Sequence, residues 1–151
     1  MDRKTVVTRV LVIAGTILAL FPLVATMVTS IIGSIMNRKF LMDYLMPAEL
    51  GLFYLTGGIF LVLASFLVKA HRKLITVSFG LAEALFLGFT LVADASGLAS
   101  GSIASESEKT FMTIVFVMLG LHILCMLITD IGAILLWKDI LGPVFRRRKL
   151  G

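Results

Sequence analysis

The sequence has little of what most metal and redox sites are made from. Cysteine occurs once, as Cys125, and histidine twice, among 151 residues. A single cysteine excludes an intrachain disulfide, and no cysteine and histidine residues show the spacing of a structural zinc site. We therefore expect neither a disulfide framework nor a metal site.

Charged residues are also scarce. Only 15% of the chain is Asp, Glu, Lys or Arg, whereas 59% is hydrophobic, and the mean hydropathy is +1.06. A soluble domain of this composition would expose too much apolar surface to water. The net charge of +5 does not indicate nucleic acid as a partner, because the basic residues flank long apolar runs instead of lining a polar face. This pattern is typical of membrane spans joined by loops.

Four apolar runs approach or exceed the length needed to cross a bilayer, which is about 20 residues for ~30 Å of hydrocarbon. They cover residues 10–35, 48–68, 74–93 and 110–137. Lipid offers no hydrogen bonds to the backbone, so each run must be helical. Because the connections are short, we predict an all-α membrane protein, an antiparallel up-down-up-down four-transmembrane-helix bundle that forms one domain over residues 1–151. The first run is too long for the apolar part of a signal peptide and is interpreted as a retained span.

The lysine and arginine residues are divided unequally between the two sides of this bundle. Eleven fall on the side of the two chain ends and three on the other. Since cytoplasmic segments carry the excess of basic residues, we predict that both termini, including a basic tail over residues 138–151, are cytoplasmic. In that tail, Arg146, Arg147, Arg148 and Lys149 either anchor the topology or bind anionic lipid, at about 1 kcal/mol per residue. The connection over residues 69–73 is short enough to predict a tight hairpin of the second and third helices.

Small residues are arranged regularly in two of the runs. Helices associate in lipid by close packing, which small side chains permit. The spacing is seven residues in the second run, at Gly51, Gly58 and Ser65, and four in the third, at Gly80, Ala84 and Gly88. We expect these to be packing seams between helices of one chain, with association of the chain with itself or another membrane protein as the alternative.

Three ionisable side chains lie inside the spans, where they are costly and usually functional. Glu83 and His122 are near the middle of their runs, and Asp130 is in the inner half. In an antiparallel pair of helices, Glu83 falls between the other two in depth, so that a hydrogen bond between Glu83 and His122 is reasonable. The trio could relay protons. The plainer interpretation is that these groups only bond helices together, or that Asp130 meets a wet inner vestibule, Arg72 or Lys73.

The sequence gives little support for haem binding or for nucleophilic catalysis. His122 is the only deep histidine, and His71 in the inner connection is too far away to share a buried haem iron with it. Cys125 lies one turn from His122 in apolar surroundings, which disfavour the reactive thiolate. No Ser/His/Asp set and no phosphate-binding glycine loop stands out. We therefore expect neither an enzyme nor a cofactor.

The segment before the second run mixes apolar, aromatic and charged residues. It reads FLMDYLMPAEL over residues 40–50, with Phe40, Asp43, Tyr44 and Glu49 as its interfacial residues, and its composition suits the headgroup layer. With the preceding Ile-Gly-Ser-Ile and the second run, it resembles a segment of small four-span bacterial membrane proteins that have no assigned activity. The resemblance implies a bacterial cytoplasmic membrane and the same four-helix layout.

Three functions follow from these observations. The leading expectation is a non-enzymatic structural, accessory or interaction subunit whose partners are membrane lipid and itself or another membrane protein. The alternative is a small proton-coupled carrier or channel-like transporter that uses Glu83, His122 and Asp130. The second alternative is a bundle that binds lipid or another hydrophobic ligand. Convergence of the three ionisable groups on a cavity would favour the carrier.

Overall fold

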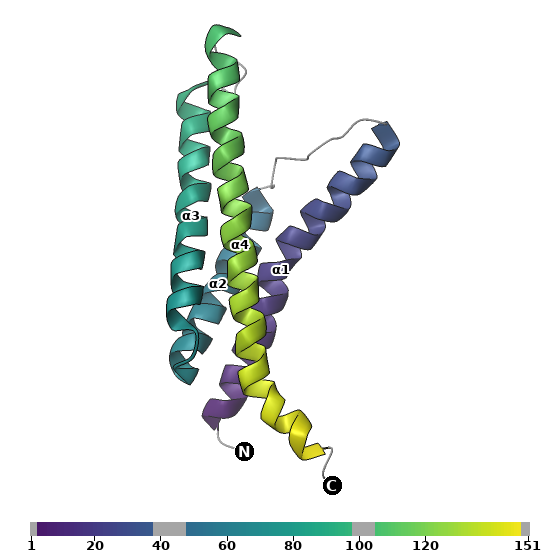
Figure 1. The fold of residues 1–151 in the computed structure, drawn as a ribbon, viewed down its shortest axis with the longest axis vertical. Helices are drawn as coiled ribbons and strands as arrows, with labels where there is room; N and C mark the ends of the chain where they lie inside the picture. The colour runs from purple at the N-terminus through teal and green to yellow at the C-terminus, as the bar shows by residue number, and fades with distance from the viewer. Residues whose placement is uncertain (1–2, 38–47, 98–104, 149–151) are drawn as a thin grey trace.

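The computed structural model describes residues 3–37, 48–97 and 105–148, and every regular element in these ranges is a helix. The elements are α1 (Arg3–Asn37), α2 (Ala48–Val68), α3 (Arg72–Ala95) and α4 (Ser105–Arg148) (Figure 1). All four contain an apolar stretch long enough to cross a membrane, namely Thr5–Thr29, Leu50–Val68, Arg72–Ala95 and Lys109–Ile140. The predictions of an all-α chain and of four helices able to span a membrane are confirmed.

The first and last helices are longer than the apolar runs that predict them. α1 has 35 residues and α4 has 44. α4 continues through Gly142 and Pro143 to Arg148, so that most of the predicted basic tail is helical. Proline removes one backbone hydrogen bond and favours a bend, and the last turns of α4 bend away in Figure 1.

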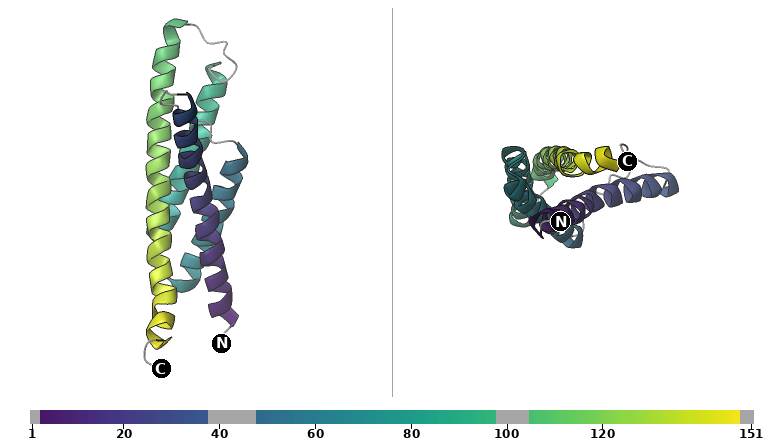
Figure 2. Two further views of the ribbon diagram at one scale, coloured as in Figure 1. Left: turned by 90° about the vertical axis from the view of Figure 1, so that its right-hand side faces the viewer. Right: turned by 90° about the horizontal axis from the view of Figure 1, so that it is seen from below.

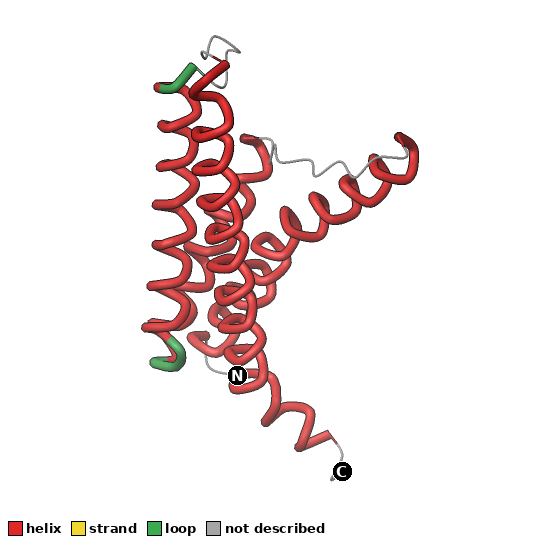
Figure 3. Tube along the Cα trace, turned by 45° about the horizontal axis from the view of Figure 1, so that its top comes forward, coloured by secondary structure: helices red, strands yellow, loops and turns green. Residues whose placement is uncertain are grey.

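The helices pack chiefly as two pairs, α1 with α2 and α3 with α4, and α1 also contacts α4. Figures 1 and 2 show that the first turn of α1 and the last turns of α4 lie at the same end. The connection between α2 and α3, green in Figure 3, lies at this end too. α2 and α3 meet over a shorter length than either pair, so they form a more open hairpin than the sequence predicts. The upper half of α1 diverges from α4 in Figure 1.

The connection between α2 and α3 is tied to α4. Lys69 and His71 both have a positive φ, of 62° and 52°, which is uncommon for residues other than glycine. The His71 carbonyl accepts a hydrogen bond from the Ile75 amide at 3.0 Å and so begins α3. Its Nε2 lies 3.1 Å from Oδ2 of Asp139 on α4.

We expect Asp139→Ala to destabilise the protein only slightly. The two side chains are 32% and 49% exposed, and an ion pair in such a position contributes less than about 1 kcal/mol. Thermal unfolding in detergent should therefore show a melting temperature close to that of wild type, as for the exposed-carboxyl control Asp94→Ala. A large decrease for Asp139→Ala alone would mean that this contact determines how α3 packs on α4.

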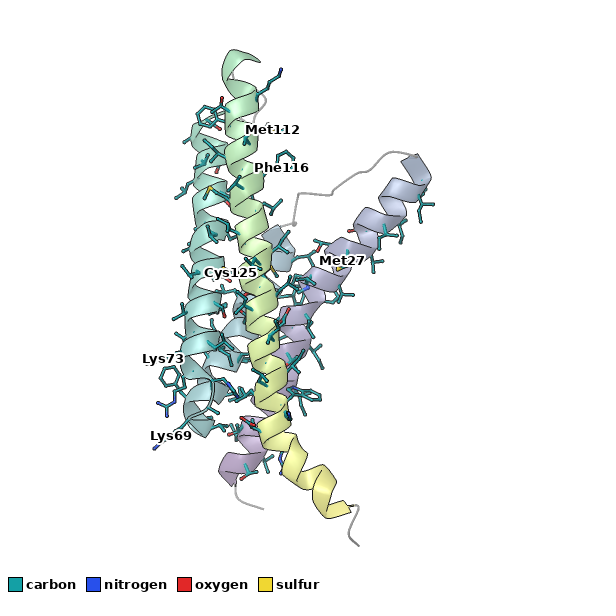
Figure 4. All side chains as sticks on the ribbon, viewed as in Figure 1. Met27, Lys69, Lys73, Met112, Phe116 and Cys125 are labelled. Carbon is teal, nitrogen blue, oxygen red and sulfur yellow. The ribbon has the colours of Figure 1, made fainter. Side chains whose placement is uncertain are left out.

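The core lies where the helices meet, and the outer surface is apolar. Fully buried side chains include Tyr54, Leu61, Ile75, Met126 and Leu136. Many other large apolar residues are exposed, and Met27, Met112 and Phe116 project from the periphery in Figure 4. Helices that are apolar on all sides, with only part of that surface buried, are typical of proteins that face lipid.

Two adjacent glycines in α2 face two different helices. A Cβ at Gly57 would lie 2.6 Å from the amide nitrogen of Ala19 and 2.8 Å from the carbonyl oxygen of Gly15, so α1 and α2 pack backbone to backbone there. A Cβ at Gly58 would overlap the Phe79 ring of α3. These two positions let α1 and α3 approach different sides of α2.

The predicted seam residues differ in their surroundings. Gly51 contacts the Phe86 ring and Gly88 faces Met118, while Ser65 is buried. A Cβ at Gly80 would meet nothing within 4 Å, and Ala84 is exposed. Gly80 and Ala84 therefore lie on the outer side of α3, because its inner side is formed by Ile75, Ser78 and Ala82.

Candidate functional site

A small pocket lies among α2, α3 and α4. It is lined by Gly51 and Tyr54 of α2, Glu83 and Phe86 of α3, and His122 of α4. Its volume is about 10 Å³, close to the space that one water molecule requires. Two of the three ionisable residues predicted for the membrane interior, Glu83 and His122, therefore share one pocket.

His122 presents a proton-accepting atom inside the bundle. Its side chain is only 2% exposed, and its Nδ1 lies 2.8 Å from the carbonyl oxygen of Ala82. A carbonyl oxygen can only accept, so Nδ1 must donate and the neutral ring carries its lone pair on Nε2. Nε2 is buried and has no hydrogen-bond partner among the described residues. The expected bond to Glu83 is not formed there: Nδ1 bonds to the Ala82 carbonyl, and Nε2 has no partner.

Aromatic rings surround this histidine. The centroid of the imidazole lies 6.2 Å from that of Tyr54 and 5.7 Å from that of Phe86. Tyr54 also packs on Phe79, with 5.7 Å between the ring centroids. Packing on several sides holds the His122 and Tyr54 rings in position.

A chain of hydroxyl groups runs from the pocket into the interface of α3 and α4. The Tyr54 hydroxyl donates to Oγ1 of Thr129 at 3.2 Å, and Thr129 donates to Oγ of Ser78 at 2.9 Å. Ser78 in turn donates to the Leu74 carbonyl at 2.7 Å. Thr129 can also donate to the Cys125 carbonyl, at 3.0 Å. The chain joins three helices, and all three hydroxyl residues are buried.

Asp130 follows directly after the central residue of this chain. It is 4% exposed, and neither carboxylate oxygen has a hydrogen-bond partner within the described ranges. The suggested contacts with Arg72 and Lys73 are not formed there. A buried carboxyl without a partner is costly, which makes Asp130 the most unusual polar group of the bundle.

Tyr54 connects the pocket to the part of α4 that carries Asp130. It lines the pocket with Glu83, and its hydroxyl donates to Thr129, the residue before Asp130. Asp130 does not line the pocket, and it is eight residues beyond His122 on α4, or about 12 Å along a helix. Only two members of the predicted trio therefore converge on the pocket, and Asp130 is a separate buried carboxyl, so the condition that would favour a carrier is met in part.

Sequence reasoning did not identify Tyr54, Ser78 and Thr129. Hydroxyl residues are common in membrane helices because they can bond to the carbonyl one turn earlier, and they do not stand out as ionisable residues do. One signal was available: Thr129 and Asp130 form a polar pair within an otherwise apolar run.

Several predicted residues cannot be placed. Phe40, Asp43, Tyr44 and Lys149 lie outside the described residues, as do the side chains of Glu49, Arg146, Arg147 and Arg148. In the part of the chain that is described, no group of three or more His, Cys, Asp or Glu side chains could hold a metal ion. The groups that gather in the site are proton donors and acceptors.

No protein-family model, curated protein or solved structure matches this chain. A function therefore has to be inferred from the side chains of the site and their geometry.

Proposed function

We propose that this chain is a small, non-enzymatic membrane protein that moves protons across a bacterial cytoplasmic membrane, as a proton-coupled carrier or channel-like transporter. The observation that supports this most strongly is the buried carboxyl of Asp130, which lacks a hydrogen-bond partner among the described residues. Ionisable groups inside membrane spans typically belong to ion or proton pathways. A group retained only to hold helices together would be expected to bond to one of them.

The proposal includes an orientation. The four helices form an antiparallel up-down-up-down bundle with both termini in the cytoplasm, which is supported by eleven basic residues on that side against three on the other. In this orientation, the pocket with Glu83 and His122 lies toward the outside, and Asp130 lies toward the cytoplasm. A proton that crosses the membrane inward would first pass the pocket and then the Asp130 carboxyl.

The small volume of the pocket and the hydrogen bonds already made by the hydroxyl groups favour the proton over larger cations. The pocket has room for about one water molecule. Hard metal cations commonly take about six oxygen ligands, but the oxygens of Tyr54, Thr129 and Ser78 are already bonded to one another. A proton needs no such ligand set, and one water in the pocket is enough to pass it on.

In the proposed orientation, tightly packed apolar side chains lie on the cytoplasmic side of the site. Leu61, Ile75 and Leu136 are fully buried, and Ile75 packs so tightly on α4 that a Cβ at Gly132 would lie 2.7 Å from its Cγ1. A carrier must open one side of its site at a time, and this packing closes the cytoplasmic side.

Proton flux through reconstituted protein tests the proposal. In liposomes that contain a pH-sensitive dye, with a potassium diffusion potential as the driving force, the internal pH should change faster with wild-type protein than without protein. Glu83→Gln should lower the protein-dependent rate by about tenfold or more, because the amide cannot exchange a proton. The control Asp94→Asn, which alters an exposed carboxyl at the end of α3, should keep the wild-type rate.

The opposite results would favour the other functions. A wild-type rate equal to that of protein-free liposomes, with any of a panel of added cations, would overturn the proposal. If Glu83→Gln then changed only the melting temperature, an accessory or interaction subunit would be the better interpretation. Lipid retained in a fixed ratio in native mass spectrometry would instead favour the lipid-binding bundle.

A further inference from the structure

The Tyr54 side chain is held rigidly between the pocket and α4. It is 2% exposed and lines the pocket together with Glu83. Its ring packs on Phe79 and His122, and its hydroxyl donates to Thr129. The ring therefore forms part of the pocket wall while the hydroxyl reaches α4 at the residue before Asp130.

The two carboxyl groups need a connection if both serve one proton pathway. Glu83 lines the pocket and Asp130 does not, and no hydrogen bond joins them in the described part of the chain. Tyr54 lines the pocket with Glu83, and its hydroxyl donates to Thr129, the residue before Asp130. A tyrosine hydroxyl can both donate and accept a proton, which is the property that a connecting group requires.

We infer that Tyr54 passes protons between Glu83 and Asp130, with Thr129 as the residue that positions its hydroxyl. This inference rests on the proposed proton transport. In the inward step, the Glu83 carboxylic acid gives its proton, through the one water for which the pocket has room, to the Tyr54 oxygen. The Tyr54 O–H bond rotates from Thr129 while the ring stays in place, and Tyr54 gives this proton to the Asp130 carboxylate. One O–H bond forms and one breaks at Tyr54, so it remains neutral, while Glu83 becomes a carboxylate and Asp130 an acid.

Thr129 directs this transfer because of the bonds it makes. Its hydroxyl proton is committed to Ser78 or to the Cys125 carbonyl, so its oxygen is left to accept from Tyr54. Ser78 can accept from Thr129 because its own proton goes to the Leu74 carbonyl. The Tyr54 proton is thereby held against Thr129, the residue before Asp130.

The proton-flux assay with Tyr54→Phe tests the inference, because this change removes the hydroxyl and keeps the ring. We expect the protein-dependent rate to fall about tenfold or more, with a melting temperature close to that of wild type. Thr129→Val, which removes a hydroxyl at nearly constant shape, should lower the rate, and Thr129→Ser should restore most of it. The control Thr113→Val removes an exposed hydroxyl from the same helix and should have no effect.

The flux measurements distinguish a failure of the Tyr54 role from a failure of the proposed proton transport. If Glu83→Gln and Asp130→Asn abolish the flux while Tyr54→Phe keeps the wild-type rate, the connecting role of Tyr54 is overturned and proton transport stands. If wild-type protein shows no flux, the proposed function fails and the inference fails with it. If Tyr54→Phe does not fold, the proton-flux rates of Thr129→Val and Thr129→Ser test the inference instead. Equal rates for these two variants would overturn it.

Discussion

Asp130→Asn is expected to reduce the proton flux of the reconstituted protein to the protein-free baseline and to leave the melting temperature unchanged or higher. The amide has nearly the shape of the carboxyl but cannot bind and release a proton, so the pathway is interrupted. Stability should not fall, because no hydrogen bond from a described residue to the carboxyl is lost. An ionised carboxylate in such a place costs several kcal/mol, and the amide avoids that cost.

The combination of the two measurements separates a transport role from a structural one. Removing one member of a buried ion pair typically costs about 3–5 kcal/mol, which a thermal melt in detergent would detect easily. A large decrease in melting temperature with undiminished flux would show that Asp130 holds the bundle together through a residue outside the described ranges. Asp139→Asn is the matched control, because Asp139 lies on the same helix with a side chain that is 49% exposed, and it should keep the wild-type flux.

Gly57→Ala is expected to destabilise the protein strongly. The added methyl would lie 2.6 Å from the Ala19 nitrogen, 2.8 Å from the Gly15 oxygen and 2.9 Å from the Leu18 carbonyl carbon. All three are backbone atoms of α1, so no side chain can rotate away and the two helices must separate. Overpacking of this kind costs about 1–3 kcal/mol or more, and the loss should appear as a lower melting temperature in detergent.

Gly80→Ala provides the comparison for this prediction. It is the same substitution in a neighbouring helix, at a position where a Cβ meets nothing within 4 Å. Alanine is more favourable than glycine inside a helix by about 0.5–1 kcal/mol, so Gly80→Ala should be neutral or stabilising. Equal effects of the two substitutions would show that α1 and α2 do not pack backbone to backbone at Gly57. Specific destabilisation by Gly80→Ala would instead indicate that the outer side of α3 contacts another copy or another protein.

The positions of the ionisable residues along their helices could be predicted, but their partners could not. Glu83 and His122 each lie near the middle of an apolar run, and the rise of a helix converts that position into depth. The two residues do line one pocket. The bond from His122 to the Ala82 carbonyl could not be predicted, because a backbone acceptor leaves no trace in the identity of a side chain.

The neighbours of the small residues could not be predicted from the sequence either. Gly57 and Gly58 are adjacent in the sequence, yet one faces the backbone of α1 and the other the Phe79 ring of α3. The regular spacing of Gly80 and Ala84 predicts a seam, but these residues lie on the outer side of α3. A soluble helix shows its buried side by its polar pattern, whereas these helices are apolar on nearly every side.

The sequence by itself determined that there are four helices and where their apolar stretches lie, because a chain in lipid must bond its own backbone groups. It also determined which ionisable residues fall within these stretches. Only the tertiary structure decided which sides of the helices meet, and so brought Tyr54, Thr129 and Ser78 into one hydrogen-bonded chain and left Asp130 without a partner among the described residues. The physical reason is that lipid is as apolar as the protein interior, so the rotation of each helix about its axis is determined by packing and by a few polar contacts.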